Sequence, residues 1–403
     1  MKISVIGLGY VGLPLALAFG KKYETIGFDI NSSRVKELLN GVDKNNEIKK
    51  KIILSKKLKL TNNKNNLTNT NIFIITVPTP IYKNKTPNLT LIKEATKLIS
   101  KYINHKNIII YESTVYPGVT EEICGQIISS VTGYELNTDF FLGYSPERIN
   151  PGDKKHTLTK IVKLISASNK STLTKIDKLY SSIINAGTYK VESIKIAEAA
   201  KVIENTQRDI NIAYVNELKI IFDKLNLDTN KILKAASTKW NFLNFKPGLV
   251  GGHCIGIDPY YLHHAALKKG YKSKIILAGR KLNDSMVAHY FNDFNFKFKK
   301  HIKKNYIKNP KILFLGLSFK SNTNDLRNSK SIDLLLRLKK KFLIDVYDPL
   351  INVKEFENQY MIKVVKSKNI NIKLYDGIIY SVNHDYFHKF NSNDDKIFKY
   401  YIN

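Results

Sequence analysis

The sequence predicts an α/β protein in which two Rossmann-like, doubly wound domains are joined by a helical middle domain. Three observations support this prediction. Short apolar runs alternate with helical patterns early in the chain, residues 193–225 contain neither Pro nor Gly, and a strand-into-glycine pattern restarts at residue 308. Strands that alternate with helices are typical of a parallel sheet with helices on both faces. We therefore expect three domains, an α/β domain at 1–190, a helical domain at 191–300 and a second α/β domain at 301–403.

Length and composition exclude several classes of protein. The chain has 403 residues, too many for one ordinary core, and its hydrophobic content of 43% is that of a globular protein. No stretch approaches the roughly 20 uninterrupted apolar residues that span a bilayer, so we expect no membrane association. Only two cysteines occur, which indicates a reducing cytoplasm. With no paired ligand spacing, we expect no metal site.

The net charge of +31 raises the question of nucleic-acid binding. Lys supplies almost all of the excess, since the chain has only six Arg, and Lys is spread among Asn and Ile rather than clustered. Arg is the better bidentate reader of phosphate. A solvated, Lys-rich surface is therefore favoured, and no nucleic-acid partner is expected.

The elements of the first domain follow in order. A strand over 2–9 runs into glycines, and a helix is expected over 10–22. A further helical pattern covers 88–103 and separates two of the later strands. Further strands are expected at 24–30, 71–80 and 106–115. The domain continues through the apolar runs at 140–149 and 160–168.

The remaining elements form the middle and last domains. The helix over 193–225 would span roughly 50 Å at 1.5 Å per residue. Helices of that length commonly bridge domains or form dimer contacts, so we expect a homodimer. Two more helical patterns, at 260–271 and 274–294, lead to about residue 300. The last domain begins with a strand at 308–319, a helix at 329–341 and a strand at 342–349.

GLGYVG (7–12) is the expected dinucleotide-binding loop. It follows a strand, opens a helix, and is followed about 20 residues on by a strand that ends at Asp29. Asp29 would accept hydrogen bonds from the ribose hydroxyls and favour NAD over NADP, although the nearby Arg34 leaves that choice open. Glycines that merely allow helix–strand packing are the alternative. The predicted loop residues are Gly7, Gly9, Tyr10, Val11 and Gly12.

Two Pro-containing turns follow later strands. VPTP (77–80) and STVYPG (113–118) each come after an apolar run, and ligands of doubly wound sheets bind at the carboxyl ends of strands. Thr79 and Thr114 are therefore candidates to contact the cofactor or a water, although ordinary turns fit the pattern equally well.

Cys254 lies in the glycine-rich stretch GLVGGHCIGIDPYYL (248–262). Glycines there allow a ligand to approach the backbone closely. A cysteine without a disulfide is more often a small buried hydrophobe than a nucleophile, and reactivity needs a polarised, accessible setting that spacing does not demonstrate. The residues alone leave both roles open.

Seven motifs together resemble the UDP-sugar 6-dehydrogenase family, and they extend over nearly the whole chain. The chain contains, in this order, GLGYVGLP, VPTP, ESTVYPG, SPERINPGD, AAKVIENTQRDINIAYVNE, PGLVGGHCIGIDPYY and GLSFKSNTNDLRNSKS. Within the family the chain is most similar to the branch that acts on UDP-N-acetylhexosamines such as UDP-GlcNAc and UDP-GalNAc, for surface polysaccharides. The resemblance implies that 1–190 binds NAD, that 191–300 forms the dimer contact and that 301–403 binds the UDP-sugar. It also implies a four-electron oxidation of the C6 alcohol to a uronic acid.

The resemblance also implies residue roles. Cys254 is the nucleophile that forms a thiohemiacetal and then a thioester, and Asp258 orients water or a neighbouring cation. Lys201 stabilises the developing oxyanion together with Asn205, one helical turn further on. Without the resemblance, Lys201 would read as a solvated helix position.

Further roles concern hydrolysis and binding. Thr114 and Glu147 position the hydrolytic water, with Glu147 as base. Lys320 contacts the substrate, Arg327 lies on the cofactor side, and Asp325 holds Arg327. The full set expected to bind substrate is Glu147, Arg148, Lys201, Asn205, Phe245, Gly251 and Lys320.

Alternatives remain at this level. Some members of the family carry a second glutamate where this chain has Pro151, which leaves the identity of the base open. Glu147 and Arg148 also fit a surface ion pair of little energetic weight. UDP-glucose or UDP-ManNAc are alternative substrates. A two-electron hydroxyacid dehydrogenase would need no nucleophilic thiol, and a basic nucleic-acid-binding protein is the remote alternative.

Overall fold

The chain is described by a computed structural model that covers residues 1–43, 54–148, 157–252, 254–367, 370–390 and 396–402. Pro151 lies outside these residues. The chain divides into two compact units. Unit 1 comprises Met1–Glu204 and Tyr260–Lys272, and unit 2 comprises Asn205–Pro259 and Ser273–Asn403. The domain boundaries at residues 190 and 300 stay predictions.

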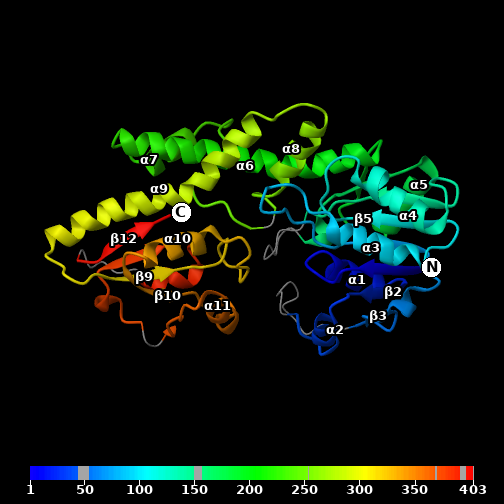
Figure 1. The fold of residues 1–403 in the computed structure, drawn as a ribbon, viewed down its shortest axis with the longest axis horizontal. Coiled ribbons are helices and arrows are strands. Elements are labelled where there is room, and N and C mark those ends of the chain that lie inside the picture. Colours follow the sequence, from blue (N-terminus) through cyan, green and yellow to red (C-terminus); the bar gives the residue numbers. More distant parts are fainter. Residues whose placement is uncertain (44–53, 149–156, 253, 368–369, 391–395, 403) are drawn as a thin grey trace. The chain divides into compact units, whose positions relative to one another are not determined.

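Unit 1 is built on an eight-stranded sheet with the order β3-β2-β1-β4-β5-β6-β7-β8 (Figure 1). The first six strands pair in parallel, in the order typical of a dinucleotide-binding fold. β7 instead pairs antiparallel with β6. A parallel pair would need a long crossover between the two strands, whereas the described part of the β6–β7 connection holds only the short helix η3 (Leu158–Lys160). The strands are β1 (Lys2–Ile6), β2 (Glu24–Phe28), β3 (Leu58–Thr61), β4 (Ile72–Ile75), β5 (Asn107–Tyr111), β6 (Phe140–Tyr144), β7 (Lys163–Ala167) and β8 (Thr188–Lys190).

Helices cover this sheet, and their starts follow local sequence signals. Asn31 caps α2 by accepting from the backbone N–H groups of Ser33 and Arg34, and Asn169 caps α5 in the same way. The helical elements of this part are α1 (Gly12–Gly20), α2 (Ser32–Leu39), η1 (Lys64–Leu67), α3 (Thr90–Ser100), the π-helix η2 (Val119–Gly125), α4 (Gln126–Thr132) and α5 (Lys170–Ser181).

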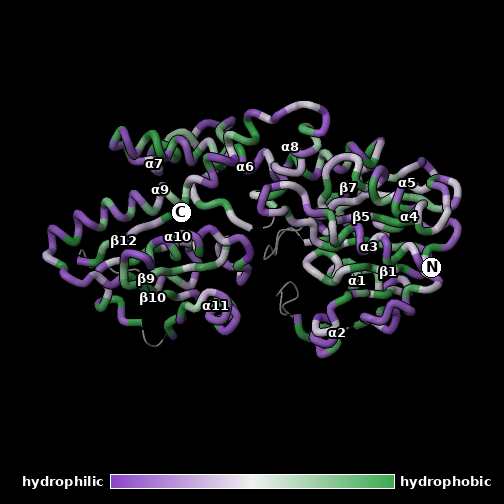
Figure 2. Tube along the Cα trace, in the orientation of Figure 1, coloured by the Kyte–Doolittle hydropathy of each residue, from purple (hydrophilic) through white to green (hydrophobic). Residues whose placement is uncertain are grey.

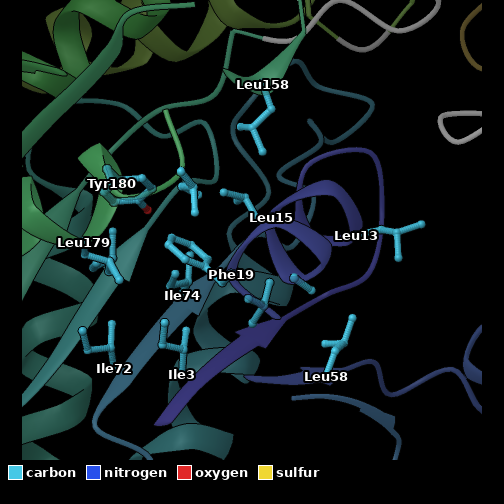
Figure 3. Packing of buried hydrophobic residues seen from close by; sticks show 14 of the residues in the cluster. Ile3, Leu13, Leu15, Phe19, Leu58, Ile72, Ile74, Leu158, Leu179 and Tyr180 are labelled. Carbon is cyan, nitrogen blue, oxygen red and sulfur yellow. The ribbon is translucent and has the colours of Figure 1, made fainter. Parts of the chain in front are cut away.

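The core of unit 1 lies between α1, α5 and the sheet. Phe19 of α1 faces Ile3 of β1 and Ile74 of β4, and the ring of Tyr180 packs edge-on against Phe19 at 5.8 Å (Figure 3). All four side chains are fully buried. This packing fixes the carboxyl ends of the strands, where the candidate site residues begin.

Unit 2 contains a four-stranded parallel sheet with the order β10-β9-β11-β12. Phe294 and Phe298 of the long helix α9 pack against Phe314 of β9 and Leu335 of α10, and hydrophilic and hydrophobic segments alternate along α9 (Figure 2). The last two strands lie in the C-terminal stretch, from which sequence patterns predicted no element. The elements are α7 (Thr229–Ala236), α9 (Ile275–Lys304), β9 (Lys311–Leu315), α10 (Lys330–Lys339), β10 (Leu343–Tyr347), α11 (Val353–Tyr360), η5 (Ile372–Leu374), β11 (Gly377–Tyr380), η6 (Asp385–Phe390) and β12 (Phe398–Tyr401).

Two helices contribute residues to both units. The predicted long helix is present as α6 (Ile194–Lys224), and α8 (Asp258–Lys268) follows the loop that carries Cys254. Across the described residues, no helix has the length and apolarity needed to cross a bilayer.

Candidate active site

The glycine-rich loop joins β1 to α1 at the carboxyl edge of the unit 1 sheet. Gly7 has φ +96°, a conformation that favours glycine, and its N–H donates to the Phe28 carbonyl at 2.8 Å. The Thr76 hydroxyl donates to the Gly7 carbonyl at 2.7 Å. A Cβ on Gly12 would overlap that same carbonyl, whereas a Cβ on Gly9 would meet no heavy atom within 4 Å. Open space therefore lies over Gly9, where a ligand can approach the backbone.

Asp29 and Arg34 brace this loop. One carboxylate oxygen of Asp29 accepts the Leu8 N–H at 2.8 Å. Arg34 donates from Nε to the Leu8 carbonyl at 3.0 Å, and its terminal nitrogens pair with Glu37 at 2.7 Å and Asp43 at 2.8 Å. The Arg34 guanidinium is thus committed to two carboxylates, which weakens its case as a 2′-phosphate ligand.

Thr79 and Thr114 lie side by side at the ends of neighbouring strands. The Thr79 hydroxyl donates to the Thr114 carbonyl at 2.5 Å. The hydroxyl of Tyr261 in α8 donates to the Thr79 carbonyl at 2.8 Å, and Ser113 donates to the Val77 carbonyl at 2.6 Å. These bonds hold both Pro-containing turns at the carboxyl ends of the strands, as expected for ligand-contacting loops.

Glu147 belongs to a buried charge cluster that the sequence did not reveal. Lys163 Nζ donates to Glu147 Oε2 at 2.7 Å and to Glu112 Oε2 at 2.6 Å. Tyr180 donates its hydroxyl proton to the other oxygen of Glu112. Glu147 is therefore a partner in a buried network and not in a surface ion pair. A Glu directly after a buried strand was the only available sequence signal for Glu112.

Arg148 connects the SPER turn to α6. Its guanidinium pairs with Glu204 at 2.5 Å and donates to the carbonyls of Ala200 and Lys201 at 3.2 Å. Lys201 itself is buried, so it is not a solvated helix position. Glu198, on the same helix, is fully buried and accepts the backbone N–H groups that start η2.

In unit 2, Asn205 and Asp258 form a buried pair beside the Cys254 loop. Asn205 Nδ2 donates to Asp258 Oδ2 at 2.6 Å, and Arg208 donates to Asn205 Oδ1 at 3.2 Å. The Asp258 N–H donates to the Cys254 carbonyl at 2.9 Å. Asp258 therefore fixes both the Asn205 amide and the backbone of the thiol-bearing turn.

The two cysteines differ in environment, and neither forms a disulfide. Cys124 is fully buried, and burial raises the pKa of its thiol to about 11, so this thiol is inert near neutral pH. Cys254 is exposed. Among the described residues, no three His, Cys, Asp or Glu side chains gather as metal ligands.

The glycines around Cys254 pack against the loop that carries Arg327. A Cβ on Gly251 would lie 2.7 Å from the Asn328 carbonyl oxygen, and Asn328 Nδ2 donates to the Gly252 carbonyl at 3.0 Å. Asp325 holds the Arg327 guanidinium through bonds of 2.8 and 2.6 Å, the contact that was predicted.

Lys320 and Phe245 also belong to unit 2. Lys320 is exposed, and its carbonyl accepts the Ser318 hydroxyl at 2.8 Å. Phe245 is half-buried. The next residues of the Lys320 loop are anchored by the buried His384, whose Nδ1 accepts the Asn322 N–H at 2.8 Å.

In unit 2, an aspartate carboxylate also accepts a backbone N–H from the loop that follows β9. Leu317 N–H donates to Asp348 Oδ2 at 2.8 Å, as Leu8 does to Asp29. Here, however, His384 contacts the same carboxylate at 3.1 Å, and Asp348 is almost wholly buried. Asp29 is only partly buried, so the loop in unit 1 is the better dinucleotide site.

The structure separates the predicted residues into two sets. The unit 1 set is Gly7, Gly9, Tyr10, Val11, Gly12, Asp29, Arg34, Thr79, Thr114, Glu147, Arg148 and Lys201. The unit 2 set is Asn205, Phe245, Gly251, Cys254, Asp258, Lys320 and Arg327. Within unit 1 the set follows the carboxyl ends of the strands, and within unit 2 Asn205, Asp258 and Cys254 are linked directly.

Comparison with known proteins matches three regions of the chain to the UDP-glucose/GDP-mannose dehydrogenase family. Its NAD binding, central and UDP binding domains match residues 1–184, 195–285 and 313–399. UDP-N-acetyl-D-glucosamine 6-dehydrogenases of Salmonella typhi and Pseudomonas aeruginosa are 49% and 48% identical to the chain, over 98% and 96% of it and 92% and 91% of their own lengths. The UDP-N-acetyl-mannosamine dehydrogenase Cap5O of Staphylococcus aureus has a similar structure, with 25% identity, a TM-score of 0.83, and 100% and 98% of the two chains covered.

Proposed function

Because the chain belongs to the UDP-glucose/GDP-mannose dehydrogenase family of NAD-dependent UDP-sugar dehydrogenases, we propose that its substrate is a UDP-N-acetylhexosamine. UDP-N-acetyl-D-glucosamine is the first candidate and the GalNAc epimer the second. Relatives named for the glucosamine substrate are 48–49% identical, whereas those named for the mannosamine substrate are 30–34% identical. The product is the corresponding UDP-uronic acid, for surface polysaccharide synthesis.

The unit 1 glycine loop fits the cofactor. Open space over Gly9 admits a pyrophosphate next to the start of α1, and the partly exposed Asp29 is available to the ribose hydroxyls. NAD, when bound, accepts a hydride in each of the two oxidations. Thr79, Thr114 and Arg327 complete the proposed cofactor contacts.

The proposed reaction assigns the protein residues to four steps. Loss of a hydride and a proton from the C6 alcohol gives an aldehyde, while Lys201 and the Asn205 amide stabilise negative charge on its oxygen. The Cys254 thiolate then bonds to the aldehyde carbon, and the carbonyl oxygen takes up a proton, forming a thiohemiacetal. Loss of a second hydride and a proton leaves a thioester. Water attacks the thioester, Glu147 takes one water proton, and the C–S bond breaks to release the thiolate and a carboxylic acid, which loses its remaining proton to solvent.

The exposed thiol of Cys254, on a turn held by Asp258, is the observation that carries this proposal. The Asp258 N–H fixes the Cys254 carbonyl at 2.9 Å, and the Asp258 carboxylate holds Asn205 at 2.6 Å. Asp258 thus contacts the nucleophile-bearing turn through its backbone N–H and the oxyanion donor Asn205 through its carboxylate. A two-electron dehydrogenase needs no nucleophilic thiol.

The remaining contacts are proposed from position and charge. We propose that Lys320 and Arg148 attract the anionic nucleotide sugar by their charge and that Phe245 and Gly251 contact it. We also propose a reducing compartment, the cytoplasm, because the reaction needs Cys254 to remain a thiol. No role is assigned to nucleic acid.

We propose a homodimer formed through α6. Ile196, Ile203, Tyr214 and Ile221 are exposed by 49%, 52%, 55% and 42%, and they are spaced by nearly whole helical turns. Such a stripe is typical of an interface. Tyr214→Asp is expected to convert a dimer to a monomer in sedimentation velocity, and a wild-type chain that sediments as a monomer contradicts the proposal.

The test of the proposed substrate is a panel of UDP-GlcNAc, UDP-GalNAc, UDP-ManNAc and UDP-glucose with NAD, read by NADH absorbance and product mass. We expect the highest kcat/KM with UDP-GlcNAc and a product heavier than the substrate by one oxygen minus two hydrogens. A preference for UDP-glucose or UDP-ManNAc would refute the substrate assignment. An aldehyde product would favour the simpler dehydrogenase.

A further inference from the structure

Glu147 belongs to a buried carboxylate–ammonium–carboxylate cluster in unit 1. Glu112 follows β5, Glu147 follows β6 and Lys163 begins β7, so three neighbouring strands bring these groups together. Their side chains are exposed by 0%, 6% and 4% respectively. Lys163 Nζ bonds to one oxygen of each carboxylate, at 2.6 Å to Glu112 and 2.7 Å to Glu147. Tyr180 of α5 donates to the second oxygen of Glu112.

The charges in this cluster do not balance when both carboxylates are ionised, since one ammonium faces two carboxylates. Burial lowers the pKa of Lys163, but the two carboxylates raise it more, so Lys163 remains an ammonium. Burial raises the pKa of Glu112 to about 7, and it raises the pKa of Tyr180 well above its usual value. Glu112 is thus a carboxylate whose ionised form burial disfavours.

Among the described residues, Arg148 is a further charged neighbour of Glu147, and its guanidinium is directed elsewhere. Only the Arg148 backbone N–H reaches Glu147, at Oε1 and 2.6 Å, while the guanidinium pairs with Glu204 and the α6 carbonyls. Lys163 thus provides a cation bonded directly to the Glu147 carboxylate, and Glu112 shares that cation.

We propose that Lys163 and Glu112 are positioning residues that set the basicity of Glu147 in thioester hydrolysis. Lys163 fixes one oxygen of Glu147 and places a positive charge beside its carboxylate. Ionised Glu112 adds a negative charge that favours transfer of the water proton to Glu147. This inference rests on the proposed function, in which Glu147 is the base for hydrolysis of the Cys254 thioester.

Removal of either positioning residue should shift the acidic limb of the kcat profile, but in opposite directions. A general loss of packing would not produce opposite shifts. Removing the cation with Lys163→Met leaves Glu147 beside an unneutralised Glu112, so the acidic limb of the kcat profile moves to higher pH. Removing the anion with Glu112→Gln leaves Glu147 paired with Lys163 alone, so the limb moves to lower pH. An adjacent charge shifts a pKa by about 1–3 units, and we expect shifts of at least about one unit.

The matched control is Lys190→Met. Lys190 lies on β8, in register with Ile165 of β7, and forms an exposed ion pair with Asp177 at 2.7 Å. The same change of side chain is made one strand away, without touching the cluster, and we expect the profile of wild type. Glu112→Gln conserves shape, so it remains informative if Lys163→Met does not fold.

The experiment measures kcat from pH 5 to 9 with UDP-GlcNAc, together with the thioester on Cys254 by intact-protein mass after acid quench. Limbs that move in opposite directions, with more trapped thioester in both variants at pH 7 and an unchanged first hydride transfer, support the inference. Limbs that stay in place or move together, while wild type turns over normally, overturn it alone. A wild type that oxidises no UDP-sugar overturns the proposed function and this inference with it.

Discussion

Replacing Gly9 by Ala should weaken NAD binding without weakening the fold. The added Cβ would have no protein heavy atom within 4 Å, and Gly9 does not have the positive φ of Gly7. The free energy of unfolding should therefore change by less than about 0.5 kcal/mol in the absence of ligand. The methyl group instead fills the space through which a pyrophosphate would approach the backbone.

The magnitude follows from the contact that is lost. A hydrogen bond to a charged group contributes about 1.5–3 kcal/mol, and each 1.4 kcal/mol is a factor of ten in affinity. Loss of one amide–phosphate bond therefore raises the Kd for NAD by roughly 10- to 150-fold. Isothermal titration calorimetry measures the Kd, and thermal melting without NAD measures the stability.

Gly12→Ala is the matched comparison. Its Cβ would overlap the Gly7 carbonyl and the Thr76 hydroxyl oxygen, so this variant should melt at a lower temperature even without ligand. Wild-type NAD affinity in Gly9→Ala, or equal loss of stability in both variants, would refute this account of the loop.

Three other perturbations have expected outcomes. Arg280→Leu removes the cation from the buried Arg280–Asp209 pair of 2.5 Å and should cost about 3–5 kcal/mol of unfolding free energy in a urea titration; a loss below about 1 kcal/mol would contradict this. Burial raises the pKa of Glu198 to about 7. The stability that this group contributes is therefore fully present below its unfolded pKa near 4.5 and is lost as pH rises through about 7. Glu198→Gln should flatten this part of the pH dependence of Tm, and an unchanged slope would count against it. His384→Leu orphans a backbone N–H of the Lys320 loop and should raise the KM for the UDP-sugar more than the KM for NAD, whereas equal increases would argue against a local effect.

Local motifs made much of unit 1 predictable. The glycine loop, Asp29 and the two Pro-containing turns each depend on a strand end and the few residues after it, so the sequence order already places them at one edge of a parallel sheet. The long helix was equally clear, because residues 193–225 lack any breaker, and it is observed as Ile194–Lys224.

Contacts between residues far apart in the sequence could not be predicted from local patterns. Glu112, Glu147 and Lys163 meet because β5, β6 and β7 are adjacent, and β7 is antiparallel to β6, which nothing in its residues indicates. Lys163 also lies within an ordinary Lys-rich background. The buried His384 was missed because the C-terminal stretch carried no recognisable pattern.

The role of Arg34 illustrates a case that only geometry decides. From its position after Asp29, Arg34 left the choice between NAD and NADP open. Its pairs with Glu37 and Asp43 and its bond to the Leu8 carbonyl give the structural role. Side-chain partners of this kind depend on loop conformations that spacing does not encode.

The number of NADH molecules formed per UDP-uronic acid tests the central claim most directly. Wild type and Cys254→Ser are compared with UDP-GlcNAc in excess NAD, and Cys124→Ala, at the buried thiol, is the control. The account predicts two NADH per uronic acid in wild type and in the control, and no uronic acid from Cys254→Ser. One NADH per product, or uronic acid formed by Cys254→Ser at the wild-type rate, would contradict it.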